Sequence, residues 1–465
     1  MNRRAAAFAA LLCLAAACGG DDSPPPATFA GSPLGSDARH FRDQQGRSVI
    51  LRGVNARVRT VFDVAFDDGR VAVEEIPELT TADCQRMAEL GFNFLRLPIS
   101  WSAVEPRRGE YSEPYLLAVD AAVECAAGAG LYVLIDFHQD AFSKEIGEDG
   151  APLWAILPAP TQLLEGPLMD LTERRLSLQV SKAFDSFFAA GDPDGLQKSF
   201  IDALAHVAAH YADAPGVAGF EIFNEPPMDP DRLYPFTYAA AERLRAVAPK
   251  KLIFFEPPVT RNQTDQAALA TAPFPVAGAI YSPHVYTSVG DSFGIEELEP
   301  SVENARGEAE SWKTPLFIGE FGHNPDAHGQ KFVGLQFDLQ DKYLASSALW
   351  LWKEHVQGSW GFFDYDQASS TFSERPLVVA TASRPWAQRI AGTPTQMQWD
   401  PAAGRLTVAY EQAVDAPNVI AVPAPYQIVS VTCDGKEVTP SGQAPRFEAT
   451  CSGAGAHTLI VKLSQ

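Results

Sequence analysis

The sequence is poor in positive charge. Its 465 residues contain 36 lysines and arginines against 58 aspartates and glutamates, which gives a formal net charge of −22. A protein that binds a phosphate backbone needs clustered lysine and arginine side chains. The composition therefore argues against a nucleic-acid partner, and the surplus of acid identifies no other partner by itself.

The apolar run near the N-terminus is too short for a stable membrane span. It follows Asn2-Arg3-Arg4 and reads AAAFAALLCLAAAC, which is typical of a secretory signal. Its end, LAAAC, resembles a bacterial lipobox, although leucine stands one place further from the cysteine than is usual. We therefore expect a lipoprotein signal peptide at 1–18 with Cys18 as the lipidation site. Plain cleavage and secretion is the alternative, and both place the mature protein outside the cytoplasm.

Cysteine is also scarce, with six residues in the chain. Cys13 and Cys18 belong to the expected signal, and the four that remain allow three pairings. They are Cys84, Cys125, Cys433 and Cys451. Proximity favours Cys84 with Cys125 and Cys433 with Cys451, and disulfides fit an oxidising compartment. No CxxC spacing occurs, and we expect no metal site.

The length exceeds the usual limit for one hydrophobic core, so two domains are expected. Residues 19–36 are rich in Gly, Ser and Pro and predict a flexible linker. Over 37–390, buried strand patterns alternate with helical patterns, which predicts an α/β fold of the (β/α)8 TIM barrel type. The strand candidates are 49–55, 94–99, 131–137, 217–223, 252–257, 279–284, 315–321 and 347–352. Short alternating runs over 391–465 predict a small β-sandwich domain.

The connection after the third strand is unusually long, from His138 to about Gly195. Loops of this length inside a compact domain are usually lids or binding segments. This one carries many apolar side chains, and two interpretations are open. The loop either packs as a satellite cluster on the barrel or offers a surface to an apolar partner. The side chains are Trp154, Ile156, Leu157, Leu163, Leu164, Leu168 and Met169.

Polar side chains follow most of the predicted strands at the carboxyl end, where a barrel of this type has its active site. They are Arg96, His138, Asp140, Asn224, Glu225, His284, Tyr286, Glu320 and Trp352. Each alone has a structural explanation, but their convergence on one face favours a catalytic site. Glu225 and Glu320 follow the fourth and seventh strands and are expected to face each other across the barrel mouth. Cleavage of a glycosidic bond needs such a pair of carboxyl groups.

In this interpretation Glu225 is the general acid/base and Glu320 the nucleophile of a retaining hydrolase, with a gap of about 5 to 5.5 Å between them. Arg96 is the cation expected to stabilise the charge of Glu320, and Tyr286 is expected to hydrogen-bond the same carboxylate. Asn224 is assigned to the sugar 2-hydroxyl. No cation follows Glu225 closely in the sequence, so we expect this acid to lie away from any salt bridge.

The remaining site candidates are assigned to substrate binding. His138, Asp140 and His284 are expected to contact sugar hydroxyls. Trp352 is expected to form the stacking floor of a sugar subsite, because the face of an aromatic ring suits a pyranose. Trp350 alternates with Trp352, and one of the two is expected to lie in the core.

The residues at these strand ends resemble those of glycoside hydrolase family 5. More narrowly, several segments are similar to those of bacterial endoglycoceramidases: IDFHQDAFS (135–143), GEDGAPLWA (147–155), EIFNEP, IYSPHVYT (280–287), IGEFG (318–322) and RIAGTPT (389–395). The resemblance covers the barrel, the long third loop and the C-terminal domain. It implies hydrolysis of the β-linkage between an oligosaccharide and ceramide, without a cofactor. The implied partner is a glycolipid at a membrane surface, which the enzyme meets through its anchor and its substrate.

The sequence departs from that pattern in two places. Arg57 and Arg59 stand where a run of small residues with a sugar-binding lysine is expected, and Lys353 and Glu354 add charge to the loop after strand eight. The preferred glycan is therefore open. Two further functions remain as alternatives: a family 5 endo-β-glucanase or related polysaccharide hydrolase, and a surface lipoprotein that binds glycans without cleaving them. Two facing acids argue against a pure binding protein.

Overall fold

The computed structural model describes residues 29, 31–262, 264, 274–286, 298–355 and 360–465. The expected signal peptide with Cys18 and most of the expected linker lie outside these residues. Within the described part of the chain, the helices are too short or too polar to cross a membrane.

Eight parallel strands form the central sheet, in the order β10-β11-β4-β5-β6-β7-β8-β9. Their bounds are β4 Arg52–Asn55, β5 Phe94–Ser100, β6 Tyr132–His138, β7 Val217–Glu221, β8 Leu252–Phe255, β9 Ala279–Tyr281, β10 Phe317–Phe321 and β11 Ser346–Leu349. A parallel bridge between Tyr281 and Leu316 joins the two edge strands. The strands are buried along their whole length because helices cover the outside and side chains fill the inside. The predicted barrel is confirmed.

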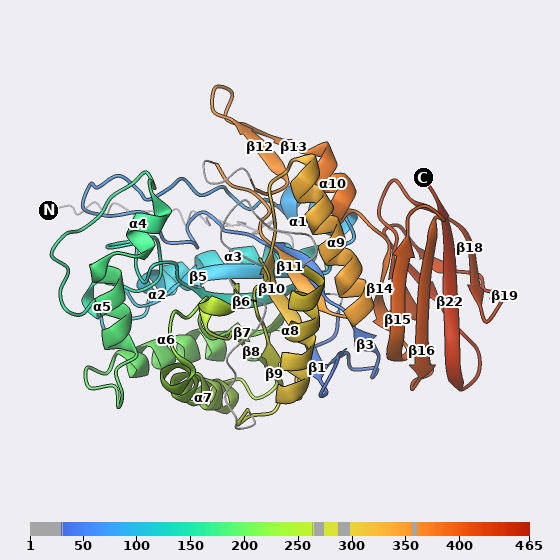
Figure 1. Cartoon of the computed structure of the whole chain (residues 1–465), viewed down its shortest axis with the longest axis horizontal. Helices are drawn as coiled ribbons and strands as arrows, with labels where there is room; N and C mark the ends of the chain where they lie inside the picture. Colours follow the sequence, from blue (N-terminus) through green and yellow to red (C-terminus); the bar gives the residue numbers. More distant parts are fainter. Residues whose placement is uncertain (1–28, 30, 263, 265–273, 287–297, 356–359) are drawn as a thin grey trace, which may run out of the picture.

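Helices surround the barrel (Figure 1). They are α1 Thr81–Glu89, α2 Trp101–Val104, α3 Glu113–Gly128, α6 Leu196–His210, α7 Pro230–Val247, α8 Leu298–Trp312 and α9 Ala327–Tyr343. Helix α1 begins at a capping box, in which Thr80 and Asp83 satisfy each other's backbone N–H groups. A disulfide between Cys84 and Cys125 links α1 to α3, as proximity in the sequence predicts.

The long third connection contains a short 3-10 helix, Leu153–Ala155, and two helices, α4 Leu171–Arg175 and α5 Leu178–Phe187. The apolar side chains of this connection divide into two groups, so packing on the barrel accounts for only some of them, and a surface for an apolar partner stays a prediction. Ile156 is buried in the main core, and Leu168 packs against a small cluster formed by the segment after β4. Leu163 and Met169 instead face solvent.

Two further sheets form a sandwich at the other end of the molecule (Figure 1). One has the order β1-β2-β3-β14-β17-β21-β20 and the other β15-β16-β22-β18-β19. The bounds are β1 Gly35–Ser36, β2 Phe41–Arg42, β3 Ser48–Val49, β14 Trp386–Ile390, β15 Gly392–Asp400, β16 Arg405–Gln412, β17 Asn418–Ala421, β18 Gln427–Cys433, β19 Lys436–Glu437, β20 Ser441–Gln443, β21 Arg446–Ala449 and β22 Gly455–Ser464. Side chains of both sheets share one core, which is the packing of a β-sandwich.

The expected domain boundary between residues 390 and 391 does not follow these sheets. Strands β1 to β3 and β14 lie on the barrel side of that boundary, yet they pair within the sandwich. The candidate strand at 49–55 divides accordingly: β3 joins the sandwich and β4 the barrel. A continuous apolar run does not reveal this division, because both parts are buried. A hairpin of β12 Phe363–Asp366 and β13 Thr371–Glu374, followed by α10 Pro376–Ala382, lies between the last barrel strand and β14 in the chain.

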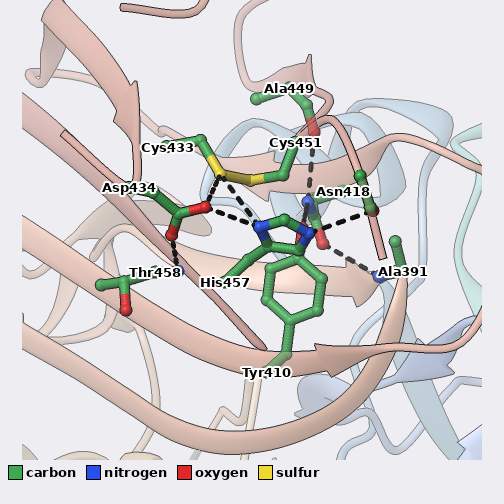
Figure 2. The surroundings of a disulfide bond; sticks show 10 residues. Ala391, Tyr410, Asn418, Cys433, Asp434, Ala449, Cys451, His457 and Thr458 are labelled. Atoms are coloured by element: carbon green, nitrogen blue, oxygen red, sulfur yellow. Dashed lines mark hydrogen bonds and ion pairs between the residues drawn. A yellow bond between two sulfur atoms is a disulfide. The ribbon is translucent and has the colours of Figure 1, made fainter. Parts of the chain in front are cut away.

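The second disulfide, Cys433–Cys451, closes the sandwich near one edge (Figure 2). His457 lies beside it, with Nδ1 at 2.7 Å from Oδ2 of Asp434 and Nε2 at 3.2 Å from the carbonyl oxygen of Gly453. The buried Asn418 side chain donates to the hydroxyl of Tyr410 at 2.9 Å. Polar groups at this edge therefore bond one another, and the pairing favoured by the sequence is confirmed.

Candidate active site

The two predicted acids meet at the carboxyl end of the barrel. Glu320 lies in β10, and Glu225 follows β7. One carboxylate oxygen of each residue and a ring nitrogen of His284 all lie within 4.8 Å of one another. Retaining glycosidases hold their carboxyl groups about 5 to 5.5 Å apart, whereas inverting enzymes leave about 6.5 to 9.5 Å for a water molecule. The observed gap has room for direct attack by a carboxylate and not for an intervening water.

Glu320 is oriented by the two donors that the sequence predicts. Nη1 of Arg96 lies 2.6 Å from Oε1, and the hydroxyl of Tyr286 donates to Oε2 at 2.8 Å. Burial and the charge of Glu320 raise the pKa of Tyr286 well above its usual value, so this phenol keeps its proton and acts as a donor. Both carboxylate oxygens are therefore held in a defined direction.

Glu225 is held through its backbone as well as its side chain. Its φ angle of 43° lies in the left-handed region that favours glycine, a strained conformation that surrounding contacts must stabilise. The backbone N–H donates to Oε2 of Glu256 at 3.1 Å. The side-chain amide of Asn262 donates to Oε1 at 2.5 Å. Both partners lie in the segment that follows β8, and they hold the carboxyl group of Glu225 beside Glu320.

The expectation that Glu225 has no cationic neighbour is wrong. Nδ1 of His284 lies 2.8 Å from Oε1 of Glu225. Burial lowers the pKa of His284, but the charges of Glu256 and Glu320 outweigh it and raise this pKa well above the usual value. The pairing was invisible in the sequence because the histidine comes from a distant strand.

His284 also corrects a second prediction, since it does not face the substrate. Its side chain is fully buried, and its ring nitrogens lie 3.3 Å from Glu256 and 3.5 Å from Glu320 in addition to the contact with Glu225. A histidine surrounded by carboxylates positions those groups and is not available to a sugar hydroxyl.

His138 and Asp140 lie together at the end of β6. Nδ1 of His138 is 2.6 Å from Asp136, and Nε2 is 3.5 Å from Asp140. Burial raises the pKa of Asp140, but Arg175 and His138 outweigh burial and lower it to about 2. Asp140 is partly exposed and is placed to accept from a sugar hydroxyl, which stays a prediction. His138 is buried, and its ring stacks on Trp350 at 5.6 Å with an interplanar angle of 12°.

The assignment of the stacking floor to Trp352 is wrong. Trp352 is 2% exposed, donates its indole N–H to Asp83 at 3.0 Å and packs against Phe362 and Phe363. Trp350 is the partly exposed tryptophan of the pair, beside His138. One ring does lie in the core, as predicted, but it is Trp352 and not Trp350. Residues two apart share a face of a regular strand, and both tryptophans follow the end of β11 at Leu349.

Comparison with known proteins agrees with this geometry. A family model described as Cellulase (glycosyl hydrolase family 5) matches residues 43–356, and the family 5 C-terminal domain model matches residues 384–461. The chain belongs to glycoside hydrolase family 5. The resemblance inferred from the strand-end residues is thereby confirmed.

Several family 5 relatives are similar over most of this chain. Endoglycoceramidase I of Rhodococcus hoagii (strain 103S) is 27% identical over 92% of this chain and 88% of its own length. Endo-glycoceramidase II from Rhodococcus sp. is 25% identical in its ganglioside GM3 complex, with a TM-score of 0.76 over 92% of this chain and 99% of that one. A crystal structure of endogalactoceramidase has a TM-score of 0.79 and 23% identity over 92% of this chain and all of that one, and shows the fold alone.

Arg96 organises a layer of acids that is larger than the sequence predicts for this family 5 site. Its guanidinium contacts four buried carboxylates and two amides: Glu221 at 2.5 Å, Glu320 at 2.6 Å, Asp136 at 3.0 Å, Glu256 at 3.4 Å, Asn224 at 2.8 Å and Asn55 at 2.9 Å. Burial lowers the pKa of Arg96, but these acids together raise it well above the usual value. Arg96 therefore stays charged and compensates for the surrounding acids.

Asp136, Glu221 and Glu256 are the members of this family 5 site that sequence reasoning missed. A signal existed for Asp136, which stands two residues before His138 on β6, so strand periodicity directs both side chains to the same face. Glu221 is the last residue of β7, and no site candidate lies two residues away on that strand. Glu256 directly follows β8 and had no such partner. Burial raises its pKa to about 8, against the opposing effect of His284.

The charged residues that depart from the family pattern form ion pairs within the protein. Arg57 is buried, pairs with Glu74 and lies 3.4 Å from Glu354, with its guanidinium over the ring of Trp350 at 5.8 Å. Lys353 pairs with Asp83. Arg59 alone is exposed, 3.4 Å from Glu78. Arg57 thus packs against Trp350 at the barrel mouth. Lys353 instead binds Asp83, which also accepts from the indole of Trp352.

Among the described residues, three groups of side chains have ligand atoms close enough for a metal ion. They are Glu225–His284–Glu320, His138–Asp140–Asp149 and Cys433–Cys451–His457. The first two groups lie among cationic side chains, and the cysteines of the third form a disulfide. His206 and His210 have an HxxxH spacing that the expectation of no metal overlooked. His206 stacks on Tyr111, and His210 pairs with Asp120 at 2.8 Å. The donor sets do not favour a metal ion.

Proposed function

We propose that this protein is a retaining endo-glycosidase that cleaves the β-glycosidic bond between the oligosaccharide and the ceramide of glycosphingolipids. The observation that carries the proposal is the Glu225–His284–Glu320 arrangement, with one oxygen of each acid within 4.8 Å, in a chain similar to endoglycoceramidase I over 92% of its length. A structure of endo-glycoceramidase II as a lactosyl-enzyme intermediate is 25% identical to this chain. In that relative, the lactosyl-enzyme intermediate is the covalent species that a retaining reaction forms.

In the proposed reaction, Glu225 gives its proton to the glycosidic oxygen while Glu320 attacks the anomeric carbon. The bond from that carbon to the oxygen breaks, ceramide leaves as an alcohol, and a glycosyl ester forms on Glu320. Water then attacks the same carbon, gives a proton to Glu225 and releases Glu320. Arg96 and Tyr286 hold Glu320 in the direction of attack, and His284 and Asn262 hold Glu225.

A substrate screen tests the proposal. The purified protein is incubated with a ganglioside, a globoside, glucosylceramide, a galactosyl lipid and cello-oligosaccharides, and products are resolved by thin-layer chromatography. We expect intact oligosaccharide and free ceramide from at least one glycosphingolipid, and none from Glu320→Gln. Release of sugar from cello-oligosaccharides alone would overturn the proposal in favour of an endo-β-glucanase, the activity named by the family model.

We also propose that the protein acts outside the cytoplasm as a lipoprotein anchored through Cys18, and meets its glycolipid substrate at a membrane surface. The support is the LAAAC segment and the two disulfides, which form stably in oxidising compartments. Mass spectrometry of the N-terminal peptide tests the anchor. A diacylglyceryl-modified Cys18 supports it, and an unmodified mature N-terminus contradicts it.

A further inference from the structure

Large apolar side chains are exposed on the third connection and on the segment beside it. Met169, Leu176 and Leu178 are 72%, 78% and 68% exposed, and Val71 and Leu163 are 55% and 42% exposed. Single exposed hydrophobic residues are ordinary on protein surfaces, but a concentration of them marks an interaction site. We call these five residues the apolar patch.

Hydrogen bonds hold the segments of the apolar patch together. The N–H of Gly166 donates to the carbonyl of Val71 at 2.9 Å, and Arg174 donates to the carbonyl of Glu165 at 2.7 Å. The side chain of Gln179 accepts from the N–H of Thr161 at 2.7 Å. The stretch at 161–168 is thus joined to α4, to α5 and to the segment after β4. The segments that carry the exposed side chains therefore form one assembly.

The apolar patch is continuous with the active site. Arg175, next to Leu176, lies 2.9 Å from Glu148 and 3.5 Å from Asp140. Asp140 in turn lies beside His138 at the end of β6. Figure 1 shows α4 and α5 at the opposite end of the molecule from strands β16 and β22. A surface that contacts the patch therefore also faces the rim of the site.

The charge of the patch segment differs from that of the whole chain. Residues 160–182 hold three acidic side chains (Glu165, Asp170 and Glu173) and three basic ones (Arg174, Arg175 and Lys182), which sum to zero, whereas the chain carries −22. Arg174 and Arg175 are bound to internal carbonyl and carboxylate groups. Val71 lies outside this range, in a segment where Asp67 and Asp68 outnumber Arg70, and adds no net basic charge to the patch. An apolar surface without an excess of basic charge is suited to a zwitterionic partner rather than an anionic one.

We propose that the apolar patch docks the protein on the zwitterionic surface of a bilayer or micelle, with the barrel mouth turned toward the lipid headgroups. The inference rests on the proposed function, because an enzyme acting on a membrane lipid must bring its site to that surface. Met169, Leu176 and Leu178 enter the interface between headgroups and acyl chains. This docking is separate from any anchor at Cys18, which tethers the chain without orienting the barrel.

The test compares two variants of the full chain, both in a Cys18→Ser background so that no lipid anchor contributes. The first is Met169→Gln/Leu176→Gln/Leu178→Gln. The second, the control, is Leu117→Gln/Val429→Gln, because Leu117 and Val429 are 68% and 65% exposed and belong to other elements, α3 and β18. All five side chains lack a buried environment, so we expect both variants to fold, which circular dichroism and thermal unfolding verify.

Three measurements separate docking from catalysis. Co-sedimentation with phosphatidylcholine vesicles should fall about 100-fold in affinity for the patch variant and stay unchanged for the control, since each lost aliphatic contact weakens partition. Turnover of glycolipid in such vesicles should fall with it. Turnover of a water-soluble aryl β-lactoside should be the same in all proteins.

Other results overturn the inference. Equal vesicle binding by both variants, or binding only to anionic vesicles and lost in high salt, contradicts docking through the patch. Capture of a protein partner without vesicle binding assigns the patch to a different role and equally contradicts it. If no protein cleaves the soluble lactoside or the glycolipid, the proposed function fails, while co-sedimentation still decides whether the patch binds lipid.

Discussion

Nδ1 of His284 lies 2.8 Å from Oε1 of Glu225, and the same atom lies 3.5 Å from Oε2 of Glu320. One buried imidazole therefore contacts both the acid/base and the nucleophile. Its other nitrogen lies 3.3 Å from Glu256. The acid/base Glu225 and the nucleophile Glu320 are therefore joined in one network through this ring. The buried Glu256 is the third carboxyl group of that network.

Replacing Glu225 with alanine should separate its two tasks. Substrates with poor leaving groups should lose about 10³-fold or more in kcat, because no acid protonates the departing oxygen. An aryl β-lactoside with a dinitrophenolate leaving group needs no proton and should still form the glycosyl-enzyme. Azide should then accelerate turnover and give a glycosyl azide, because it attacks without a general base. Glu320→Gln serves as the control with no product, and equal losses for all leaving groups would contradict the role of Glu225.

Replacing Glu256 tests whether it positions the acid/base. Glu256→Ala removes the acceptor for the strained backbone N–H of Glu225 and should lower kcat about 10- to 100-fold, since small misplacements of catalytic groups are costly. Glu256→Gln keeps an acceptor at that position and should restore most of the activity. A loss in the glutamine variant as large as in the alanine variant would show that geometry is not the reason.

The pH profile of the same variants provides a second measurement. The pKa of Glu256 is raised to about 8, so this carboxyl is neutral at pH 7 and ionises as the pH rises through 8. The new negative charge lies 3.3 Å from His284 and binds its imidazolium more tightly, which weakens the interaction of this ring with Glu225. The kcat/KM of the natural protein should therefore decline there. Glutamine cannot ionise, and its profile should lack this step. An identical alkaline limb in both proteins would contradict the assignment.

The two tryptophans should respond in different ways. Trp350→Ala should raise KM for the glycan about 3- to 10-fold, as expected for loss of a ring that faces the site. Trp352→Phe should leave KM unchanged and lower stability by about 1 to 3 kcal/mol, because Asp83 loses a buried hydrogen-bond partner. Thermal unfolding and steady-state kinetics measure both effects, and the reverse pattern would restore Trp352 as the sugar platform.

His40 should make stability depend on pH. Burial and the neighbouring Arg42 lower its pKa from 6.5 to about 4, against the attraction of Asp37, so the folded protein holds this ring neutral. The folded state then binds fewer protons than the unfolded state between pH 6.5 and 4. The contribution of the neutral His40 to the free energy of unfolding is fully present above pH 6.5. It falls as the pH drops toward 4, by up to roughly 3 kcal/mol. Denaturant unfolding of His40→Gln across this range should show a flatter profile, and an unchanged slope would contradict it.

Much of the fold was predictable because its signals are local. Eight buried runs, separated by helical patterns, indicated the barrel, and all eight contain a strand of the central sheet. The acids were found because strand ends at one face of a parallel barrel converge. The strand at 49–55 was only half correct: burial does not reveal which of two sheets a segment joins, and β3 pairs with the sandwich.

The sequence by itself determined the alternation of strands and helices, the two acids at the barrel mouth and the family to which they belong. Only the tertiary structure decided which tryptophan faces the site. Residues two apart share a face of a regular strand, but both tryptophans follow the end of β11 at Leu349, where strand periodicity no longer fixes the direction of a side chain. Only barrel closure brought His284, Glu225 and Glu256 together, because contacts between residues from separate strands depend on where the strands lie in space.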